Sequence, residues 1–179
     1  MKLELKNVSY NPRLSEETYC FSADLIADGK MIAVCKNSGH GGNTDIKAIK
    51  GYDEVLEKAR EYTKAMPPIK VEDFDLEMDL ELYINGLMSE YVFEKMVLKP
   101  KQKKNLITGK NRREVYYQAW HYGGTRTKIP IEDLLIDESG RKMLEKAITE
   151  SLKEGEEVFN TNIPKEFIES VREKISIEK

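Results

Sequence analysis

The first fifty residues alternate between apolar and polar positions, as half-buried β-strands do. Leu3 and Leu5 alternate with lysine and glutamate, and a second run alternates in the same way over residues 19–25. A polar connection at 11–17 lies between them. Both runs therefore predict strands of a sheet with one buried face.

The dipeptide Asp28-Gly29 separates the second run from a third. Asp-Gly between two alternating runs is typical of a tight hairpin turn, because both residues tolerate positive φ. A two-residue turn here would pair Leu25 with Ile32 and Ala23 with Val34, with the apolar side chains on one face. We therefore expect an N-terminal antiparallel meander.

Helical periodicity takes over after this meander. Apolar residues three and four positions apart predict two central helices, at about 52–66 and 76–98, and Pro100 is expected to close the second. The same spacing predicts two C-terminal helices, one at about 139–153 and one that begins near Pro164.

A second β region is expected between the two pairs of helices. Residues 114–122 are rich in β-forming side chains, and a turn at 108–111 precedes them. Gly123-Gly124 would allow a further hairpin into 125–131. Strands and helices are thus grouped rather than alternating, which favours an α+β fold. We expect a single domain over 1–179, with a division into 1–98 and 99–179 as the alternative.

Composition narrows the class of protein. The chain has 179 residues, of which 40% are hydrophobic and 34% charged, enough for a core without disulfides or metals. No apolar run reaches the roughly 20 residues that span a bilayer, and the N-terminus has no signal-peptide pattern. We therefore expect a cytoplasmic protein without a membrane partner. The only cysteines, Cys20 and Cys35, fall in predicted strands and are expected to be buried free thiols.

Charge is strongly segregated, although the net charge is only −3. Residues 52–94 carry twelve acidic and four basic side chains, whereas residues 95–128 carry ten basic side chains and one acidic. An excess of this kind attracts polyanions. It could equally pair with the acidic helices of the same protein, or with a second copy in a homo-oligomer.

The glycine-rich loop 38–44 is a candidate phosphate-binding element. Gly39, His40, Gly41 and Gly42 follow a strand and offer flexible backbone N–H groups beside an imidazole. The loop matches neither common phosphate-binding glycine motif and does not open directly into a helix. A plain connecting turn is the structural alternative.

Catalytic motifs are absent from the sequence, and its two histidines and two cysteines have no metal-ligand spacing. We therefore expect neither a cofactor nor a metal, and a binding protein rather than an enzyme. A phosphate-ester hydrolase that uses His40 remains the enzymatic alternative.

The basic hairpin has more chemical content, because arginine and lysine bind phosphates while aromatic rings stack on bases. Strand alternation predicts that one set of its aromatic residues is mostly core, with Tyr116, Trp120 and Tyr122 on one face and Tyr117 on the other. The residues expected to contact an anionic ligand are Arg112, Arg113, Tyr116, Trp120, Arg126 and Lys128. A solvated linker beside an ordinary hairpin is the structural alternative.

Three N-terminal stretches, LELKNV, LSEETYCFSADLIADGK and NSGHGG, together resemble small uncharacterised proteins encoded by bacteriophages and prophages. The resemblance covers about the first 45 residues and carries no activity or functional residue. It implies an accessory protein that acts inside a bacterial host. Our expectation is therefore a phage-type protein that binds nucleic acid or a nucleotide, with an inhibitor of a host or anti-phage defence protein as the alternative.

Overall fold

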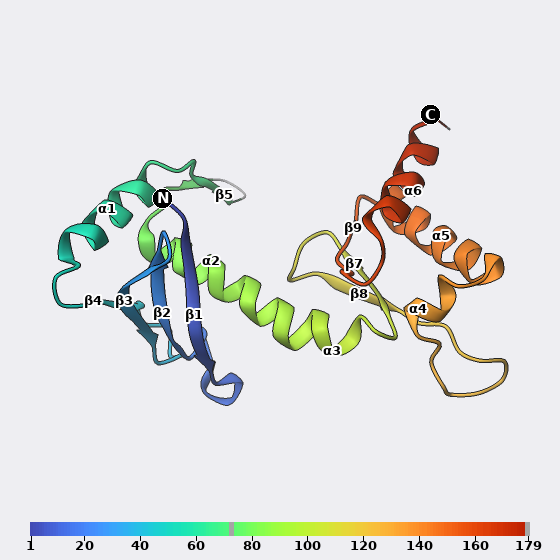
Figure 1. The fold of residues 1–179 in the computed structure, drawn as a ribbon, viewed down its shortest axis with the longest axis horizontal. Coiled ribbons are helices and arrows are strands. Elements are labelled where there is room, and N and C mark those ends of the chain that lie inside the picture. The colour runs from blue at the N-terminus through green and yellow to red at the C-terminus, as the bar shows by residue number, and fades with distance from the viewer. Residues whose placement is uncertain (72–73, 178–179) are drawn as a thin grey trace. The chain divides into compact units, whose positions relative to one another are not determined.

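The computed structural model describes residues 1–71 and 74–177, and its contacts divide the chain into two compact units, Met1–Tyr91 and Val92–Lys179 (Figure 1). Helices and antiparallel sheets occur in both units, so the predicted α+β class is confirmed. The predicted order is also confirmed: an N-terminal meander, two central helices, a second hairpin region and two C-terminal helices.

The first unit is built on a four-stranded antiparallel sheet in which each strand pairs with the next along the chain. Its inner face carries buried side chains such as Leu25 and Ile32, neither of which has any exposed surface. The strands are β1 (Leu3–Tyr10), β2 (Phe21–Ala27), β3 (Lys30–Asn37) and β4 (Asp45–Ala48).

The predicted turn between β2 and β3 is present, with φ of 48° at Asp28 and 83° at Gly29. The predicted register is wrong beyond the turn, because Leu25 pairs with Ala33 rather than with Ile32. A β-bulge inserts Ile32 as an extra residue, and both Ile32 and Ala33 are fully buried. For the same reason Ala23 pairs with Cys35 and not with Val34.

Two helices and a small hairpin complete the first unit. Helix α1 buries Leu56 and Ala59, and α2 buries Leu80, Ile84 and Met88. Their bounds, with those of the hairpin strands between them, are α1 (Asp53–Lys64), β5 (Ile69–Val71), β6 (Phe74–Leu76) and α2 (Leu80–Val92). The second predicted helix therefore begins later than expected, since part of its lead-in is a strand.

The predicted stop at Pro100 is wrong by one residue. After α2 the backbone widens into a π-helix, Phe93–Leu98, and the short helix α3 (Lys99–Lys101) follows it. The N–H of Lys99 donates to the carbonyl of Glu94, five residues earlier. Pro100 has no N–H to donate, and the chain passes it within this altered helical register.

The second unit contains a three-stranded antiparallel sheet in the order β8–β7–β9, so β7 is central and β8 lies at an edge. Its strands are β7 (Leu106–Gly109), β8 (Val115–Gln118) and β9 (Glu157–Val158). Its other helices are α4 (Ile131–Leu134), α5 (Glu138–Lys153) and α6 (Lys165–Ile177).

Each face of this sheet has its own core. Leu106 belongs to a cluster formed with α4, α5 and α6, in which Leu144 and Ile148 are fully buried. Ile107, the next residue of β7, belongs to a cluster with Phe93 and Leu98 of the π-helix. The sheet is therefore covered by the C-terminal helices on one side and by the π-helix on the other.

The hairpin predicted after Gly123-Gly124 is reduced to an isolated bridge between His121 and Lys128. Strand β8 ends at Gln118, so the expected alternation does not continue to Trp120. Trp120 is half-buried and packs against the core formed with the C-terminal helices. The expectation that one set of these rings is mostly core is wrong. Tyr117 and His121 are exposed on one predicted face, and Tyr116 and Tyr122 are exposed on the other.

Candidate functional site

The sequence-predicted residues fall in two different units. The glycine-rich loop lies in the first unit, between β3 and β4, whereas the basic residues 112–128 lie in the second. Each group is therefore assessed within its own unit.

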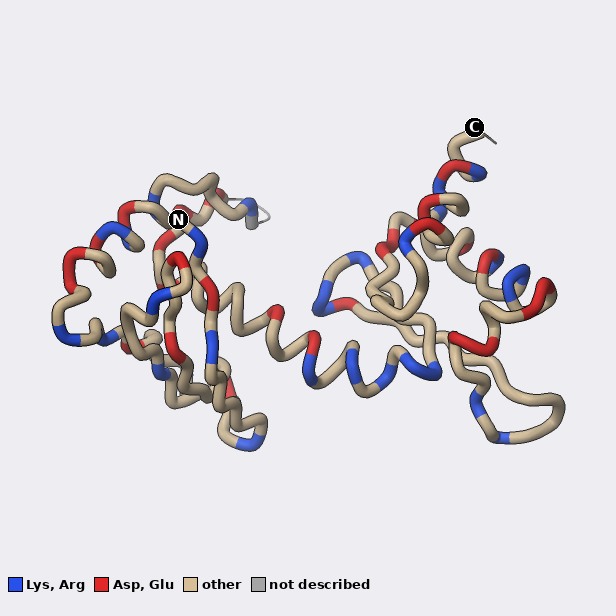
Figure 2. Tube along the Cα trace, viewed as in Figure 1, with Lys and Arg blue, Asp and Glu red and all other residues tan. Residues whose placement is uncertain are grey.

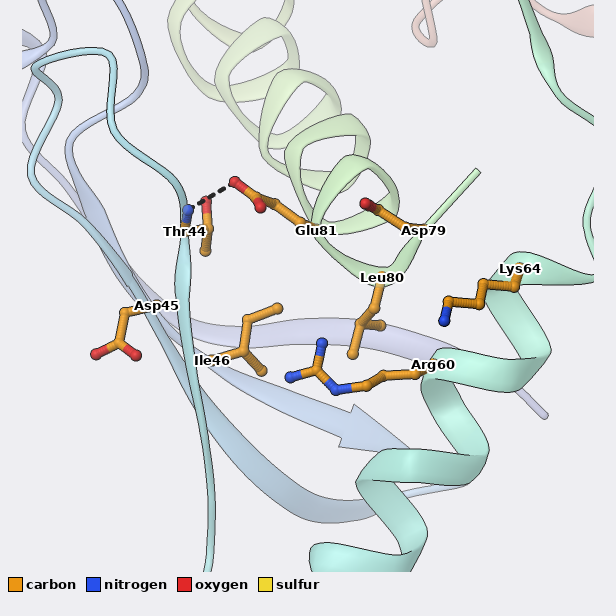
Figure 3. A pocket seen from close by; sticks show the side chains of 8 residues that line it. All are labelled: Thr44, Asp45, Ile46, Arg60, Lys64, Asp79, Leu80 and Glu81. Carbon is orange, nitrogen blue, oxygen red and sulfur yellow. Dashed lines mark hydrogen bonds between the residues drawn. The ribbon is translucent and has the colours of Figure 1, made fainter. Parts of the chain in front are cut away.

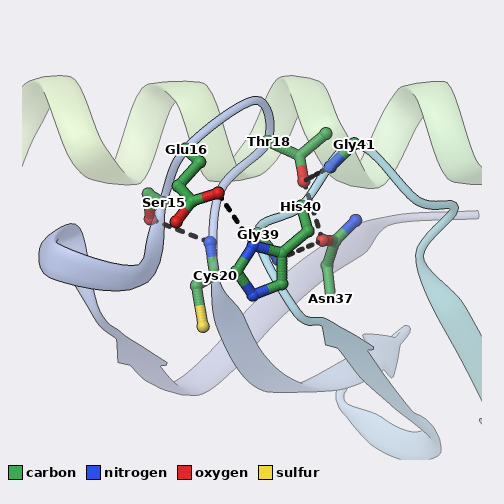
Figure 4. Close-up of polar contacts among 8 residues, drawn as sticks. All are labelled: Ser15, Glu16, Thr18, Cys20, Asn37, Gly39, His40 and Gly41. Carbon is green, nitrogen blue, oxygen red and sulfur yellow. Dashed lines mark hydrogen bonds and ion pairs between the residues drawn. The ribbon is translucent and has the colours of Figure 1, made fainter.

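The glycine-rich loop is locked to the segment that precedes β2 (Figure 4). The Gly39 carbonyl accepts hydrogen bonds from the successive N–H groups of Glu16, Glu17 and Thr18, at 3.0, 3.1 and 3.3 Å. Asn37 Oδ1 in turn accepts from the Gly39 N–H at 2.8 Å and from the Thr18 hydroxyl at 2.9 Å. Two of the loop's own N–H donors are therefore already used within the protein: Gly39 donates to Asn37 Oδ1, and Gly41 donates to Thr18 Oγ1 at 3.3 Å.

Close packing accounts for two of the glycines. Gly39 has φ of 92° and Gly41 φ of 80°, conformations that favour glycine. A Cβ at Gly39 would collide with the Leu14 carbonyl oxygen, whereas one at Gly41 would meet only the end of the flexible Glu17 side chain. At Gly42 a Cβ would meet no other atom. The structure therefore gives a packing reason for Gly39 and a conformational reason for both Gly39 and Gly41.

His40 pairs with a carboxylate at the surface. Its Nδ1 lies 3.1 Å from Glu16 Oε2, and its side chain is 56% exposed. A carboxylate at Nδ1 orients the imidazole ring. The pair is solvated, because both side chains are more than half exposed.

The two cysteines differ in environment. Burial, with a smaller contribution from Asp24, raises the pKa of the Cys35 thiol to about 12, so this thiol is protonated at neutral pH. Cys20 lies just before β2 rather than within it and is half-buried. The prediction of a buried strand residue is thus confirmed for Cys35 and wrong for Cys20.

In the second unit, basic residues occur along the π-helix and α3 and in the turn between β7 and β8 (Figure 2). Lys101 Nζ lies 4.2 Å from the centre of the Tyr117 ring. The Arg112 guanidinium, in the turn after β7, lies 5.9 Å from the centre of the Phe93 ring. Both distances are within the range of cation–π attraction. These contacts bring two basic regions to one side of the sheet.

Lys128 lies on the same side of the sheet, next to Asn105, the residue that precedes β7. Its ammonium donates to Asn105 Oδ1 at 2.8 Å, and the Asn105 amide donates to the Lys101 carbonyl at 2.7 Å. We call Arg112, Lys101, Lys128 and Tyr117 the basic face. Its three cations come from three segments that are separated in sequence.

A buried asparagine fixes the helix end that carries Lys101. Asn160 Oδ1 accepts from the Ile107 N–H at 2.6 Å, while its amide donates to the carbonyls of Asn105 at 3.0 Å and Gln102 at 3.3 Å. One side chain therefore joins strand β7 to the chain that follows α3. Because Asn160 is only 5% exposed, loss of this side chain would leave buried polar groups unpaired.

The remaining predicted residues have different surroundings. Arg113 lies in the β7–β8 turn, where Asn111 Oδ1 accepts from its N–H at 2.8 Å. Arg126 lies near the tip of the loop around Gly124, away from any regular strand. Trp120 serves the core. The set named from the sequence is therefore dispersed within the second unit.

Tyr116 lies on the opposite side of the sheet from Tyr117. It pairs with Thr108, whose side chain faces α5, and it lines a groove of about 700 Å³ together with Glu150, Glu154 and Glu156. Its hydroxyl donates to Glu114 Oε1 at 2.8 Å. That hydrogen bond, followed by the charges of the nearby glutamates, raises the pKa of Tyr116 above its usual value. This groove is acidic, so Tyr116 does not belong to the basic face.

Lys101 and Tyr117 were not among the residues predicted for ligand contact. Lys101 was placed in a linker after a helix that was expected to end at Pro100, and Tyr117 was placed on the other face from the chosen rings. The usable signal was strand alternation, which separates Tyr117 from Tyr116.

Within residues 1–71 and 74–177, no three histidine, cysteine or acidic side chains are arranged to hold a metal ion. None of the helices in these ranges combines the length and apolar character needed to cross a membrane.

Comparisons of the chain with protein-family models, with curated proteins and with solved structures gave no match.

Proposed function

We propose that the second unit binds a polyanion of the nucleic-acid class through the basic face. In this proposal Arg112, Lys101 and Lys128 contact phosphates, and Tyr117 stacks on an unpaired base. The protein would act by binding rather than by catalysis, as a phage-type accessory protein in the bacterial cytoplasm.

The observation that carries the proposal is the position of Lys101 over the Tyr117 ring, 4.2 Å from its centre. A cation beside an exposed ring offers a phosphate contact and a stacking surface at the same place. Arg112, in the β7–β8 turn, lies near Phe93 at the start of the π-helix, and Lys128 lies next to Asn105, which follows α3. The three cations thus lie near the segment from Phe93 to Asn105, and in this proposal they follow a single-stranded backbone.

Intramolecular neutralisation accounts for only part of the positive charge. Lys99 pairs with Glu94 at 2.8 Å, but this ion pair is exposed and contributes little stability. The contacts that place Lys101 and Lys128 are to an aromatic ring and to an amide, which leaves their full charge uncompensated. Both ammonium groups therefore remain able to attract phosphate.

Binding of the full-length protein to labelled single-stranded and double-stranded oligonucleotides, measured by fluorescence anisotropy over a series of salt concentrations, tests the proposal. We expect single strands to bind more tightly, because only unpaired bases can stack on Tyr117. Replacing Arg112, Lys101 and Lys128 together by glutamine should lower affinity at least about tenfold. It should also reduce the slope of log K against log salt by about 2, since each lost phosphate contact on a single strand contributes roughly 0.7.

A matched control removes the same charge elsewhere in the unit. Arg141, Lys142 and Lys165 are exposed and lie on α5 and α6. Their replacement by glutamine should leave most of the affinity and slope intact. Equal losses in the two triple variants, or the absence of salt-sensitive binding by the unmodified protein, would contradict the proposal.

A second candidate function is docking to a host or defence protein through the acidic groove. Strand β8 has a neighbour on one side only, so the backbone groups of its outer edge are open to an added strand. Glu150, Glu154 and Glu156 line the groove beside this edge and would attract a basic segment of the partner.

Capture of partners from a bacterial lysate separates the two functions. Partners that persist after nuclease treatment and are lost when Glu154 and Glu156 are replaced by glutamine would favour docking. Loss of all partners on nuclease treatment would favour nucleic acid. A second copy of the chain, which has both basic and acidic surfaces, would be recognised by concentration-dependent mass in light scattering.

A further inference from the structure

A cleft of about 370 Å³ lies in the first unit, between α1, β4 and the start of α2 (Figure 3). Ile46 from β4 and Leu80 from α2 form its apolar floor. Arg60 and Lys64 stand on the α1 side, and Asp79 and Glu81 on the α2 side. Asp45, at the start of β4, also lines the cleft, but its carboxylate pairs with Lys47 at 3.1 Å. The cleft thus has a cationic wall and an anionic wall above a nonpolar floor.

The anionic wall is held in place by the backbone. Asp79 Oδ1 accepts from the Leu82 N–H at 2.7 Å and caps the start of α2. Glu81 Oε1 accepts from the Thr44 N–H at 2.7 Å and ties α2 to β4. A carboxylate can accept several hydrogen bonds, so each keeps acceptor capacity beyond its one backbone donor.

The cationic wall has little internal compensation. Arg60 and Lys64 are one helical turn apart and share a face of α1. Arg60 Nε has one ion-pair contact, 3.8 Å from Glu57 Oε2, which lies outside the cleft. Lys64 has no hydrogen bond or ion pair to any residue that the structure describes. Its ammonium therefore enters the cleft without a protein partner.

The two walls do not neutralise each other. Among these four side chains, all of which the structure describes, no ion pair crosses the cleft. Opposite charges held apart in this way are complementary to a ligand that carries a negative group at one end and a positive group at the other. An anion alone would face three carboxylates, those of Asp45, Asp79 and Glu81, and a cation alone would face two basic groups.

We propose that this cleft is a binding site for a small zwitterion, specifically an α-amino acid with an apolar side chain. The amino acid's carboxylate binds Arg60 and Lys64, with the guanidinium suited to a bidentate contact. Its ammonium group binds Asp79 and Glu81. Its side chain lies on Ile46 and Leu80, and the cleft volume is within the range of small-molecule sites.

Three leucine compounds test the two ends of the ligand separately, in two-dimensional NMR titrations of the full-length protein. L-Leucine has both charges, leucinamide lacks the carboxylate, and N-acetylleucine lacks the ammonium group. We expect leucine to shift the amide signals of Thr44, Asp45 and Ile46 at millimolar concentrations. Each analogue should bind at least about tenfold more weakly, because each loses a pair of charge-assisted hydrogen bonds.

Substitutions assign each end of the ligand to a wall. Arg60→Gln should weaken leucine binding about tenfold and leave leucinamide binding unchanged. Asp79→Asn should weaken leucine binding while leaving N-acetylleucine binding unchanged, and asparagine preserves the helix cap. Lys58→Gln, an exposed cation of α1 that is not among the cleft-lining residues, serves as the control and should change nothing.

Several outcomes would overturn the proposal. One is the absence of leucine-induced shifts at millimolar concentrations; another is equal binding of leucine and N-acetylleucine. A third is coupling between Arg60→Gln and Asp79→Asn in the free energy of unfolding without ligand, since the two residues would then pair directly across the cleft.

Discussion

Tyr116 and Tyr117 are neighbours in β8 and are almost equally exposed, at 45% and 44%, yet their surroundings have opposite charge. Tyr117 lies beneath the ammonium group of Lys101 on the π-helix side. Tyr116 donates its hydroxyl to Glu114. Both tyrosines and Lys110 line the groove beside α5, but the charges that act on the Tyr116 hydroxyl are those of glutamates. We therefore expect Tyr117 to be the ring that stacks on a base next to a phosphate.

This difference shows that a basic, aromatic segment cannot be treated as one surface when it forms a strand. Adjacent side chains of a strand point to opposite faces, so each face must be judged by the helix that covers it. The π-helix side supplies lysine and arginine to Tyr117, whereas α5 and the following residues supply glutamates to Tyr116. The proposed ligand contact thus depends on alternation as well as on local charge.

The largest expected effect comes from truncating a buried side chain on one face of the β8–β7–β9 sheet. Ile107→Ala should lower the free energy of unfolding by about 2–5 kcal/mol, because Ile107 is fully buried against Phe93 and Leu98. Denaturant unfolding would measure this loss. The same variant should weaken nucleic-acid binding by the folded protein, since the π-helix loses its contact with the sheet. Leu106→Ala, on the other face, should destabilise comparably but leave the affinity of the folded protein nearly unchanged.

The next effect concerns the two rings themselves. Tyr117→Ala should weaken binding to single-stranded oligonucleotides by about 1–3 kcal/mol, the usual contribution of a stacked base. Tyr117→Phe should keep most of the affinity, and Tyr116→Ala should leave it unchanged. Anisotropy titrations at one salt concentration compare the three variants. Equal losses from Tyr116→Ala and Tyr117→Ala would contradict the assignment of ligand binding to one face.

A smaller effect is expected from reversing the charge of two glutamates that line the acidic groove. Replacing Glu154 and Glu156 by lysine should raise affinity for single strands and steepen the salt dependence by about 1, from two added phosphate contacts. In that background Tyr116→Ala should begin to weaken binding. If Tyr116→Ala still has no effect, charge alone does not explain the difference between the rings.

The smallest effect is spectroscopic. The hydrogen bond to Glu114, with added repulsion from nearby glutamates, raises the pKa of Tyr116, so this phenol should ionise later than an ordinary tyrosine in an ultraviolet pH titration. A raised pKa in the folded protein means that the hydrogen bond is present below the ordinary tyrosine pKa of about 10 and is lost as pH rises through the folded value. Glu114→Gln should lower the pKa of Tyr116, with Tyr116→Phe identifying its signal.

Sequence patterns predicted the elements better than the contacts between them. The Asp28-Gly29 turn follows from local chemistry, but the bulge at Ile32 does not, because it depends on what both faces of the sheet must bury. No sequence pattern near Trp120 indicates that β8 ends at Gln118. The sequence does not predict the role of Asn160, because the backbone groups that it joins are more than fifty positions away. Its separation from Ile107, for example, is 53 residues.

The sequence predicted that the basic segment would contain the candidate site, but not which of its residues come together. Arg112 and Lys128 were named from the sequence, and the structure brings both to the face that also holds Lys101. The position of Lys101 depends on the helix that continues past Pro100, which local propensity argues against. Charge counting therefore located the segment but not its geometry.

The π-helix at Phe93–Leu98 sets the rotational phase of the chain that follows it. Each residue of an α-helix turns the chain by about 100°, and a π-turn accommodates one residue more than an α-turn. If the same residues formed an ordinary α-helix, with no π-turn, Lys101 would be rotated by about 100° relative to Phe93. The protein would keep every charge of its basic face, yet its lysine would no longer lie over Tyr117. The π-turn therefore decides whether this cation and this ring face the same ligand.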